Sequence, residues 1–212
     1  MFELEKKDAA QKALALIPHD CVLGIGTGST VHYFIEGLSN YRSKIAAVVS
    51  SSKNSTTKLM AQGFKVLDLN EVGSSLDLYV DGADEISPQG VMIKGGGGAL
   101  TQEKILVEAA RQFICIIDSS KCVQTLGKTP IPIEIIPSAR GLIARKMIAL
   151  GATPKLRENF ITDNGNLILD VDHLDLSDPK RTETLLNNLP GVVTVGIFST
   201  PPTKIIKGIF TT

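Results

Sequence analysis

VLGIGTGSTVHYFIEGL, residues 22–38, decides the fold, because it predicts a buried strand, a tight turn and a helix in direct succession. Residues 22–26 form a short apolar run, and residues 31–38 carry apolar side chains at the spacing of one helix face. Glycines in the turn between them permit a sharp change of chain direction. This strand–turn–helix order is typical of a parallel sheet with crossover helices.

The same alternation of short strands and helices continues to about residue 117. Further apolar runs predict buried strands at IAAVV (45–49), FKVL (64–67), LDLYV (76–80) and FICII (113–117). Helical patterns cover residues 3–17, a segment that ends near Gly63, and residues 101–112. Short strands without polar alternation indicate a sheet covered on both faces. We therefore expect a doubly wound, mostly parallel, Rossmann-like α/β domain.

The pattern changes after about residue 127 to the order β-α-β-β-α-β. The expected elements are a strand at 130–136, a helix at 139–150, strands at 153–158 and 166–172, a helix at 178–189 and a strand at 192–198. This order is that of ferredoxin-like α+β domains. KIIKGIF (204–210) predicts a last strand that rejoins the first domain. The expected domains are 1–127 plus 200–212, Rossmann-like, and 128–199, ferredoxin-like.

Composition excludes several classes of protein. Among 212 residues, Lys+Arg and Asp+Glu are both 22, so no net field recruits nucleic acid or an acidic membrane. No apolar run approaches the roughly 20 residues of a membrane span, and residues 1–17 lack the features of a signal peptide. We expect a cytoplasmic protein. The three cysteines and three histidines show no ligand spacing, so we expect no metal site and no disulfide.

Polar connections follow four of the predicted strands: GTGST (26–30), SSSKNST (50–56), DGADE (81–85) and DSSK (118–121). In a doubly wound sheet, ligands bind beyond the carboxyl ends of the strands. The run GIGTGS (24–29) departs from the dinucleotide fingerprint, because its sixth position is Ser29 in place of Gly or Ala and no acidic residue follows about 20 positions later. Two interpretations stay open: phosphate binding by Thr27, Gly28, Ser29 and Thr30, or a tight turn in which Ser29 or Thr30 caps the helix.

The segment 81–104 brings together several carboxylates, two lysines and four consecutive glycines. Glycines allow the backbone to approach a ligand closely, and successive N–H groups bind anions. Glu103 is a candidate base for removing a proton from carbon, and Lys94 with backbone amides is a candidate for holding the oxyanion. This combination suits enolisation of a small polyol phosphate without metal or cofactor. The alternatives are solvated turn residues and a first-turn carboxylate that stabilises the helix dipole.

The chain resembles the type A family of ribose-5-phosphate isomerases in five motifs, which occur in that family's order and spacing. The motifs are GTGST (26–30), DGADE (81–85), MIKGGGGALTQEK (92–104), DSSK (118–121) and PIPIEIIP (130–137). The resemblance runs over essentially the whole chain. It implies interconversion of D-ribose 5-phosphate and D-ribulose 5-phosphate in the non-oxidative pentose phosphate pathway, through an enediolate and without a cofactor. It also implies a homodimer or a dimer of dimers.

Carried onto this sequence, the resemblance implies that Glu103 moves the proton between C1 and C2. Asp81 and Asp84 bind sugar hydroxyls and assist proton transfer between oxygens, and Lys94 stabilises the enediolate. The substrate-binding set comprises Thr27, Gly28, Ser29, Thr30, Asp81, Gly82, Ala83, Asp84, Lys94, Gly95, Gly96, Gly97, Lys121 and Lys6. Lys6 fits the family spacing better than Lys7. Gly98 stands where many members have Ala, and we expect it to loosen the loop slightly.

Two rival functions are compatible with these residues. One is a coenzyme A transferase-like enzyme in which Glu103 is a nucleophile that forms an acyl thioester. The other is a non-catalytic sugar-phosphate sensor, although the chain has no helix-turn-helix or basic patch through which to act on nucleic acid.

Overall fold

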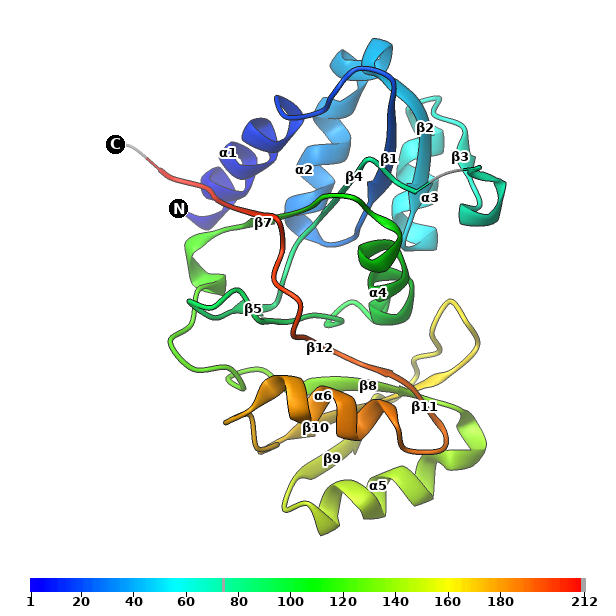
Figure 1. The fold of residues 1–212 in the computed structure, drawn as a ribbon, viewed down its shortest axis with the longest axis vertical. Helices are drawn as coiled ribbons and strands as arrows, with labels where there is room; N and C mark the ends of the chain where they lie inside the picture. Colours follow the sequence, from blue (N-terminus) through cyan, green and yellow to red (C-terminus); the bar gives the residue numbers. More distant parts are fainter. Residues whose placement is uncertain (74, 211–212) are drawn as a thin grey trace. The chain divides into compact units, whose positions relative to one another are not determined.

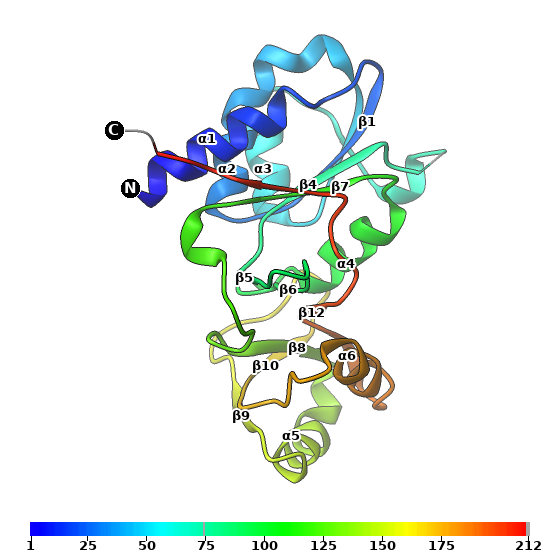
Figure 2. The same ribbon diagram turned by 60° about the vertical axis from the view of Figure 1, so that its left-hand side comes forward.

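The computed structural model describes residues 1–73 and 75–210, which form two compact units (Figures 1 and 2). The first unit comprises residues 1–82, 102–121 and 202–212, and the second comprises residues 83–101 and 122–201. Among the described residues, every helix is too short or too polar to span a bilayer.

The first unit is built on a six-stranded parallel sheet. Its strands are β1 (Cys21–Ile25), β2 (Ile45–Ser50), β3 (Val66–Leu67), β4 (Leu78–Asp81), β7 (Phe113–Ile117) and β13 (Lys204–Lys207), in the order β13-β7-β4-β1-β2-β3. The predicted run FICII coincides with β7. From β1 the chain proceeds outward through β2 to β3, and then returns to β4 on the other side of β1. The doubly wound fold is therefore confirmed, and its switch point lies between β1 and β4.

The helices of the first unit are α1 (Phe2–Leu14), α2 (Ser29–Gly37), α3 (Lys53–Ala61) and most of α4 (Leu100–Ala109). α1 and α2 lie side by side, and α1 also contacts β7 and β13 (Figures 1 and 2). The apolar positions of α2 that the sequence indicates all lie in the core, since Val31, Phe34, Ile35 and the following Leu38 are each at most 1% exposed. Burial of this face holds the start of α2 against the end of β1.

The second unit contains a four-stranded antiparallel sheet in the order β11-β8-β10-β9. Its elements are β8 (Ile131–Ile135), α5 (Arg140–Ala149), β9 (Thr153–Leu156), β10 (Leu167–Asp172), α6 (Pro179–Asn187) and β11 (Val192–Val195). Asp178 caps α6 by accepting the Arg181 N–H at 3.0 Å, and Pro179 occupies the first helical position. The ferredoxin-like domain that the sequence predicts is confirmed.

The glycine-rich segment differs from expectation. We expected residues 83–101 in the first domain, but their contacts group them with the second unit. Two short strands that sequence periodicity does not reveal, β5 (Glu85–Ile86) and β6 (Met92–Ile93), explain the difference, because β6 pairs with β12 (Ile197–Phe198). The Glu85 carboxylate also accepts hydrogen bonds from the backbone N–H groups of Gly127 and Thr129.

The single strand expected at 192–198 is in fact two strands, β11 and β12, which belong to different sheets. Gly196 separates them. Its N–H donates to the Pro132 carbonyl at 2.7 Å, and its carbonyl accepts the Lys94 N–H at 2.9 Å. A Cβ atom at this position would lie 2.3 Å from the Lys94 carbonyl oxygen. Glycine therefore lets the chain pass close to Lys94 while it leaves one sheet and enters the next.

Candidate active site

The two strands beside the switch point bring together the motifs that follow them. GTGST leaves β1, and DGADE begins at the last residue of β4. β1 and β4 are paired in parallel, with Ile25 opposite Val80. GTGST and the first two residues of DGADE, Asp81 and Gly82, consequently lie at the carboxyl edge of the sheet in the first unit, where the sequence predicts a ligand site.

Asp81 connects these two motifs and is fully buried. Its Oδ1 accepts hydrogen bonds from the Thr27 N–H at 3.0 Å and the Gly82 N–H at 2.7 Å. Its Oδ2 accepts the Tyr79 hydroxyl at 2.6 Å. Charge-assisted hydrogen bonds of this kind are stronger than neutral ones. The carboxylate therefore holds the backbone of the GTGST turn in place.

Glu103 lies in the first turn of α4 and is 3% exposed. Burial raises the pKa of the Tyr79 phenol well above its usual value, and the negative charges of Asp81 and Glu103 raise it further. The two carboxylates thus act on one buried phenol within the first unit. The Tyr79 phenol therefore stays protonated at neutral pH, where its hydroxyl donates a hydrogen bond to Asp81.

The N-terminus of α2 forms the remaining part of the GTGST turn. Gly28, with φ +111°, is the residue before the helix, and no side chain of the described residues caps it. The capping role considered for Ser29 and Thr30 is therefore not observed. Gly28 and Ser29 are exposed, Thr27 is half-buried and Thr30 is buried. Backbone N–H groups at such a helix start are ready to bind an anion.

The lysines expected near the phosphate lie on two elements of the first unit. Lys6 on α1 forms an ion pair with Glu3 at 2.7 Å, and the Lys7 ammonium lies 5.3 Å from the centre of the Tyr33 ring on α2. Lys121 ends the short helix η3 (Ser119–Lys121) and is half-buried.

Glu5 ties α1 to the turn that carries Lys121. Its side chain is buried and accepts the Ser119 N–H at 2.6 Å. This hydrogen bonding with Ser119 lowers the pKa of the Glu5 carboxyl. The carboxylate therefore joins two segments that are far apart in the sequence, and sequence inspection gave Glu5 no role.

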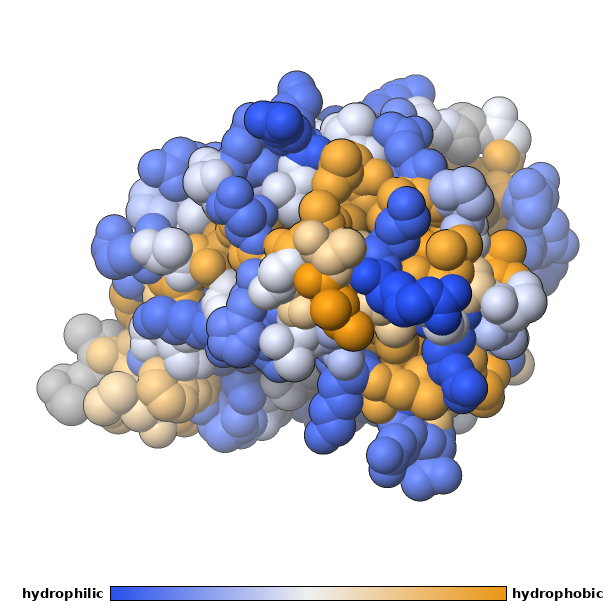
Figure 3. Space-filling model, turned by 90° about the horizontal axis from the view of Figure 1, so that it is seen from below, coloured by the Kyte–Doolittle hydropathy of each residue, from blue (hydrophilic) through white to orange (hydrophobic). Residues whose placement is uncertain are grey.

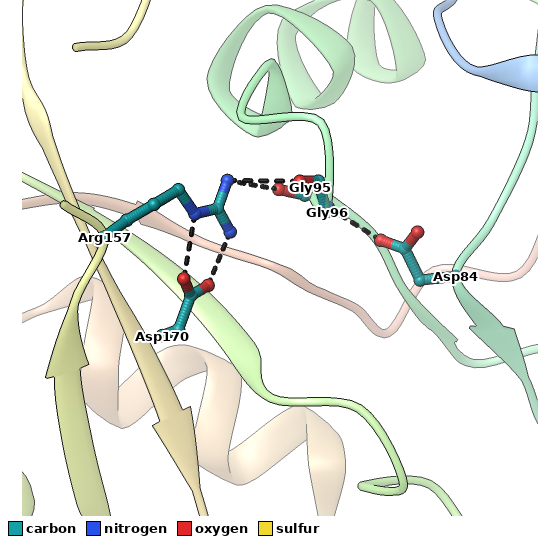
Figure 4. A network of polar contacts seen from close by, with 5 residues as sticks. All are labelled: Asp84, Gly95, Gly96, Arg157 and Asp170. Carbon is teal, nitrogen blue, oxygen red and sulfur yellow. Dashed lines mark hydrogen bonds and ion pairs between the residues drawn. The ribbon is translucent and has the colours of Figure 1, made fainter. Parts of the chain in front are cut away.

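In the second unit, the glycine loop (residues 94–99) packs against Asp84. The Gly96 N–H donates to the Asp84 Oδ2 at 2.7 Å (Figure 4). A Cβ atom on Gly96 would lie only 2.9–3.1 Å from the carboxylate atoms of Asp84, so only glycine permits this approach. Gly96 and Gly97 are exposed, Gly95 is buried, and Gly82, Ala83 and Asp84 are half-buried.

Lys94 at the start of this loop is almost fully buried, at 3% exposed. Its ammonium lies 5.6 Å from the centre of the Phe198 ring, within the range of a cation–π interaction. The backbone N–H of Lys94 donates a hydrogen bond to the Gly196 carbonyl, which holds this residue in the second unit. A buried ammonium of this kind is suited to stabilising a developing negative charge.

The structure explains why position 98 is occupied by glycine, a requirement that the sequence does not reveal. Its φ is +82°, and a Cβ atom would lie 2.1 Å from Cζ of Phe160. The ring of Phe160 thus occupies the space that a larger residue at position 98 needs. Our expectation that Gly98 loosens the loop took no account of this contact.

We predict that Gly98→Ala lowers the free energy of unfolding by about 1–2 kcal/mol through left-handed backbone strain and by about 1–3 kcal/mol more through overlap with Phe160. Urea denaturation measures the change. Phe160→Val in the same chain should recover the overlap part and leave the strain. Gly141→Ala in α5 is the control and should not destabilise. Equal stabilities of the single and double variants would contradict the role of Phe160.

Sequence reasoning missed four residues that contact the expected site residues or the segments that carry them: Glu5, Tyr79, Arg157 and Phe160. Tyr79 had a detectable signal, because residues two apart on a strand face the same side and Tyr79 stands two before Asp81. The sequence carries no such signal for Glu5, Arg157 and Phe160, because the residues that they contact are far away in the chain. Within residues 1–73 and 75–210, no cluster of three or more His, Cys, Asp or Glu side chains is arranged to hold a metal ion.

Comparison with known proteins identifies the family. Residues 47–209 match ribose 5-phosphate isomerase A (phosphoriboisomerase A). The chain is 57% identical over 197 residues to ribose-5-phosphate isomerase A of Francisella tularensis subsp. tularensis (strain WY96-3418), covering 93% of this chain and 88% of the relative.

Solved structures agree. Ribose 5-phosphate isomerase A from Neisseria gonorrhoeae superposes with a TM-score of 0.90 at 45% identity, covering 93% of this chain and 88% of that one. A D-ribose-5-phosphate isomerase in complex with phospho-erythronic acid gives a TM-score of 0.91 at 37% identity, covering 97% and 95%. The chain therefore belongs to the ribose 5-phosphate isomerase A family.

Proposed function

We propose that this chain interconverts D-ribose 5-phosphate and D-ribulose 5-phosphate by proton transfer through an enediolate. Family membership at 57% identity is the observation that carries the proposal. Its chemistry is supported by the buried carboxylate of Glu103, whose negative charge acts on the Tyr79 phenol that donates a hydrogen bond to Asp81. The reaction belongs to the non-oxidative pentose phosphate pathway.

In the proposed mechanism, the Glu103 carboxylate removes the proton from C2 of the open-chain aldose. The resulting carboxylic acid returns the proton to C1, and Glu103 ends the cycle ionised. Between these steps a proton reaches O1 and another leaves O2, a transfer that we assign to Asp84. Glu103 is 3% exposed, so bulk water has limited access to its carboxyl group, and the proton that it carries exchanges with solvent in a fraction of the turnovers before it reaches C1.

We assign stabilisation of the enediolate to Lys94 and to the backbone N–H groups of Gly95, Gly96 and Gly97. The side chain of Lys94 is already buried, and so little reorganisation accompanies charge development. We assign Asp81 a supporting part, since three donors already occupy its oxygens. Gly82 and Ala83 complete the substrate-binding segment.

The phosphate in this proposal binds the GTGST turn at Thr27, Gly28, Ser29 and Thr30. The exposed and uncapped N-terminus of α2 supports this assignment. Lys121 and Lys6 supply positive charge. The phospho-erythronic acid bound to the related isomerase combines a phosphate with a carboxylate, and a planar carboxylate resembles an enediolate.

Proton NMR of ribose 5-phosphate with the protein in D₂O containing EDTA tests the function. Ribulose 5-phosphate that carries deuterium at carbon is the expected product, and activity should survive the chelator. Absence of product would overturn the proposal. Retained binding would then favour a sensor, and a Glu103 adduct trapped from acyl-CoA with hydroxylamine would favour the coenzyme A transferase-like reaction.

We predict that Lys121→Ala raises KM more than it lowers kcat. Phosphate binding remote from the reacting carbons is nearly equal in the ground state and the transition state, so its loss weakens binding more than chemistry. Steady-state kinetics with ribose 5-phosphate measures both constants, with Lys128→Ala as the matched control. A loss confined to kcat would contradict the phosphate role of Lys121.

We also propose a homodimer, or a dimer of dimers, in the cytoplasm. Apolar side chains gather on the face seen in Figure 3. Separately, the exposed large apolar side chains of the second unit include Leu142, Ile148, Leu150 and Leu185. Contiguous exposed apolar surface is typical of subunit interfaces. Sedimentation equilibrium of the purified protein tests the assembly, and a monomer at micromolar concentration would contradict it.

A further inference from the structure

Arg157 contacts the glycine loop from the side opposite Asp84, and none of the roles proposed so far involves it. Its Nε and Nη2 donate to the two carboxylate oxygens of Asp170 at 2.8 and 2.5 Å (Figure 4). Its Nη1 donates to the carbonyl oxygens of Gly96 at 3.2 Å and Gly95 at 3.5 Å. The guanidinium therefore joins β10 to the glycine loop.

Gly96 is held on both sides. Its N–H donates to Asp84 and its carbonyl accepts from Arg157, so the position of this one residue depends on both charged groups. Asp170 belongs to β10, which is paired on both edges with β8 and β9. The contacts thus link the position of Gly96, an exposed residue of the glycine loop, to a strand in the middle of the sheet.

A second contact reinforces the first. The Arg157 guanidinium lies 5.2 Å from the centre of the Phe160 ring, which covers Gly98. Arg157 therefore reaches the loop directly at Gly95 and Gly96, and indirectly at Gly98 through Phe160. A purely structural ion pair needs only the two bonds to Asp170, whereas the third nitrogen is directed at the loop.

We propose that Arg157 is a positioning residue for the isomerase reaction, and this inference rests on the function proposed above. It holds the glycine loop so that the N–H of Gly96 orients the Asp84 carboxylate and the loop presents Lys94 and its amides to the enediolate. Lysine cannot replace it fully, because an ammonium has no planar fork to bind Asp170 twice while reaching Gly96.

Arg157→Ala should lower kcat by about 10–100-fold with KM changed less than about threefold, since small displacements of catalytic groups cost rate more than affinity. Arg157→Lys should retain an intermediate kcat. Arg145→Ala, an exposed arginine of α5, is the matched control and should behave as wild type. Circular dichroism and thermal melting establish that each variant is folded.

Chemical rescue supplies a readout that a merely structural role would not give. Arg157 and Asp170 line a hollow together with Pro130, Lys155, Leu156, Glu158 and Asp172. Millimolar methylguanidine should enter the space left in Arg157→Ala and raise kcat severalfold, with no effect on wild type. Unchanged kcat in Arg157→Ala, or a reduced kcat that methylguanidine does not raise, would overturn the proposal.

Hydrogen exchange separates this inference from the proposed function. In Arg157→Ala, exchange of the amides in residues 94–101 should accelerate, because the Gly96 N–H loses the geometry of its bond to Asp84. Peptides from α2 serve as the internal control. Unchanged exchange in the loop would overturn the positioning role whatever the kinetics show. A wild-type protein without isomerase activity would instead overturn the proposed function, and the exchange result would still decide whether Arg157 holds the loop.

Discussion

Glu103→Gln should lower kcat for ribose 5-phosphate isomerisation by about 10²–10⁴-fold, the range for loss of a positioned general base. Gln has nearly the same shape, and Glu103 is 3% exposed, so the variant should fold and still bind substrate. Steady-state kinetics in both directions measures the loss. Deuterium incorporation from D₂O into the substrate pool should fall in parallel, because one group performs both proton transfers.

Glu108→Gln is the matched control, since Glu108 lies on the same helix and is exposed. It should leave kcat and KM unchanged. Near-normal turnover of Glu103→Gln would contradict the assignment of Glu103 as the general base. A variant whose melting temperature fell far below that of wild type would indicate a structural role for the carboxylate.

Lys94→Met should lower kcat by about 10²–10³-fold, as expected when one donor to a developing oxyanion is removed. Met keeps the length of the apolar stem, which matters because Lys94 is buried in the second unit. KM should change much less than kcat, because the ammonium interacts most strongly with the enediolate. Inhibition by phospho-erythronic acid, the ligand of the related isomerase, offers a second measurement, and the affinity of the protein for this acid should weaken in the variant.

Lys146→Met, on the exposed face of α5, controls for the loss of one positive charge and should leave kcat and KM unchanged. If Lys94→Met weakened substrate and the erythronate equally with little change in kcat, Lys94 would bind the ground state and would not stabilise the intermediate. The enediolate role would then pass to the backbone amides of the loop.

Strands and strand-end loops were predictable because their signals are local. Five consecutive apolar residues predicted β7 at its observed bounds, Phe113–Ile117. The rule that ligands bind beyond the carboxyl ends of parallel strands predicted that GTGST and Asp81 come together, and the Thr27–Asp81 hydrogen bond confirms their proximity.

Contacts between segments that are far apart in the chain were not predictable, because the local patterns of a single sequence do not indicate which distant residues meet. β5 and β6 have two residues each, too few for any periodicity, and so residues 83–101 were assigned to the wrong unit. Arg157 and Gly96 are 61 positions apart. Gly196 interrupts the apolar run 192–198, and nothing in this run indicates that its two parts form strands of different sheets.

The position of β13 at the edge of the first sheet has a consequence during protein synthesis. β7 pairs with β4 on one edge and with β13 on the other, yet β13 is translated only after all elements of the second unit. Ribosomes add about 5–20 residues per second. For on the order of ten seconds, the nascent chain therefore carries the apolar FICII strand with an open edge, a template for pairing with other chains. Chaperone protection is most needed in that interval.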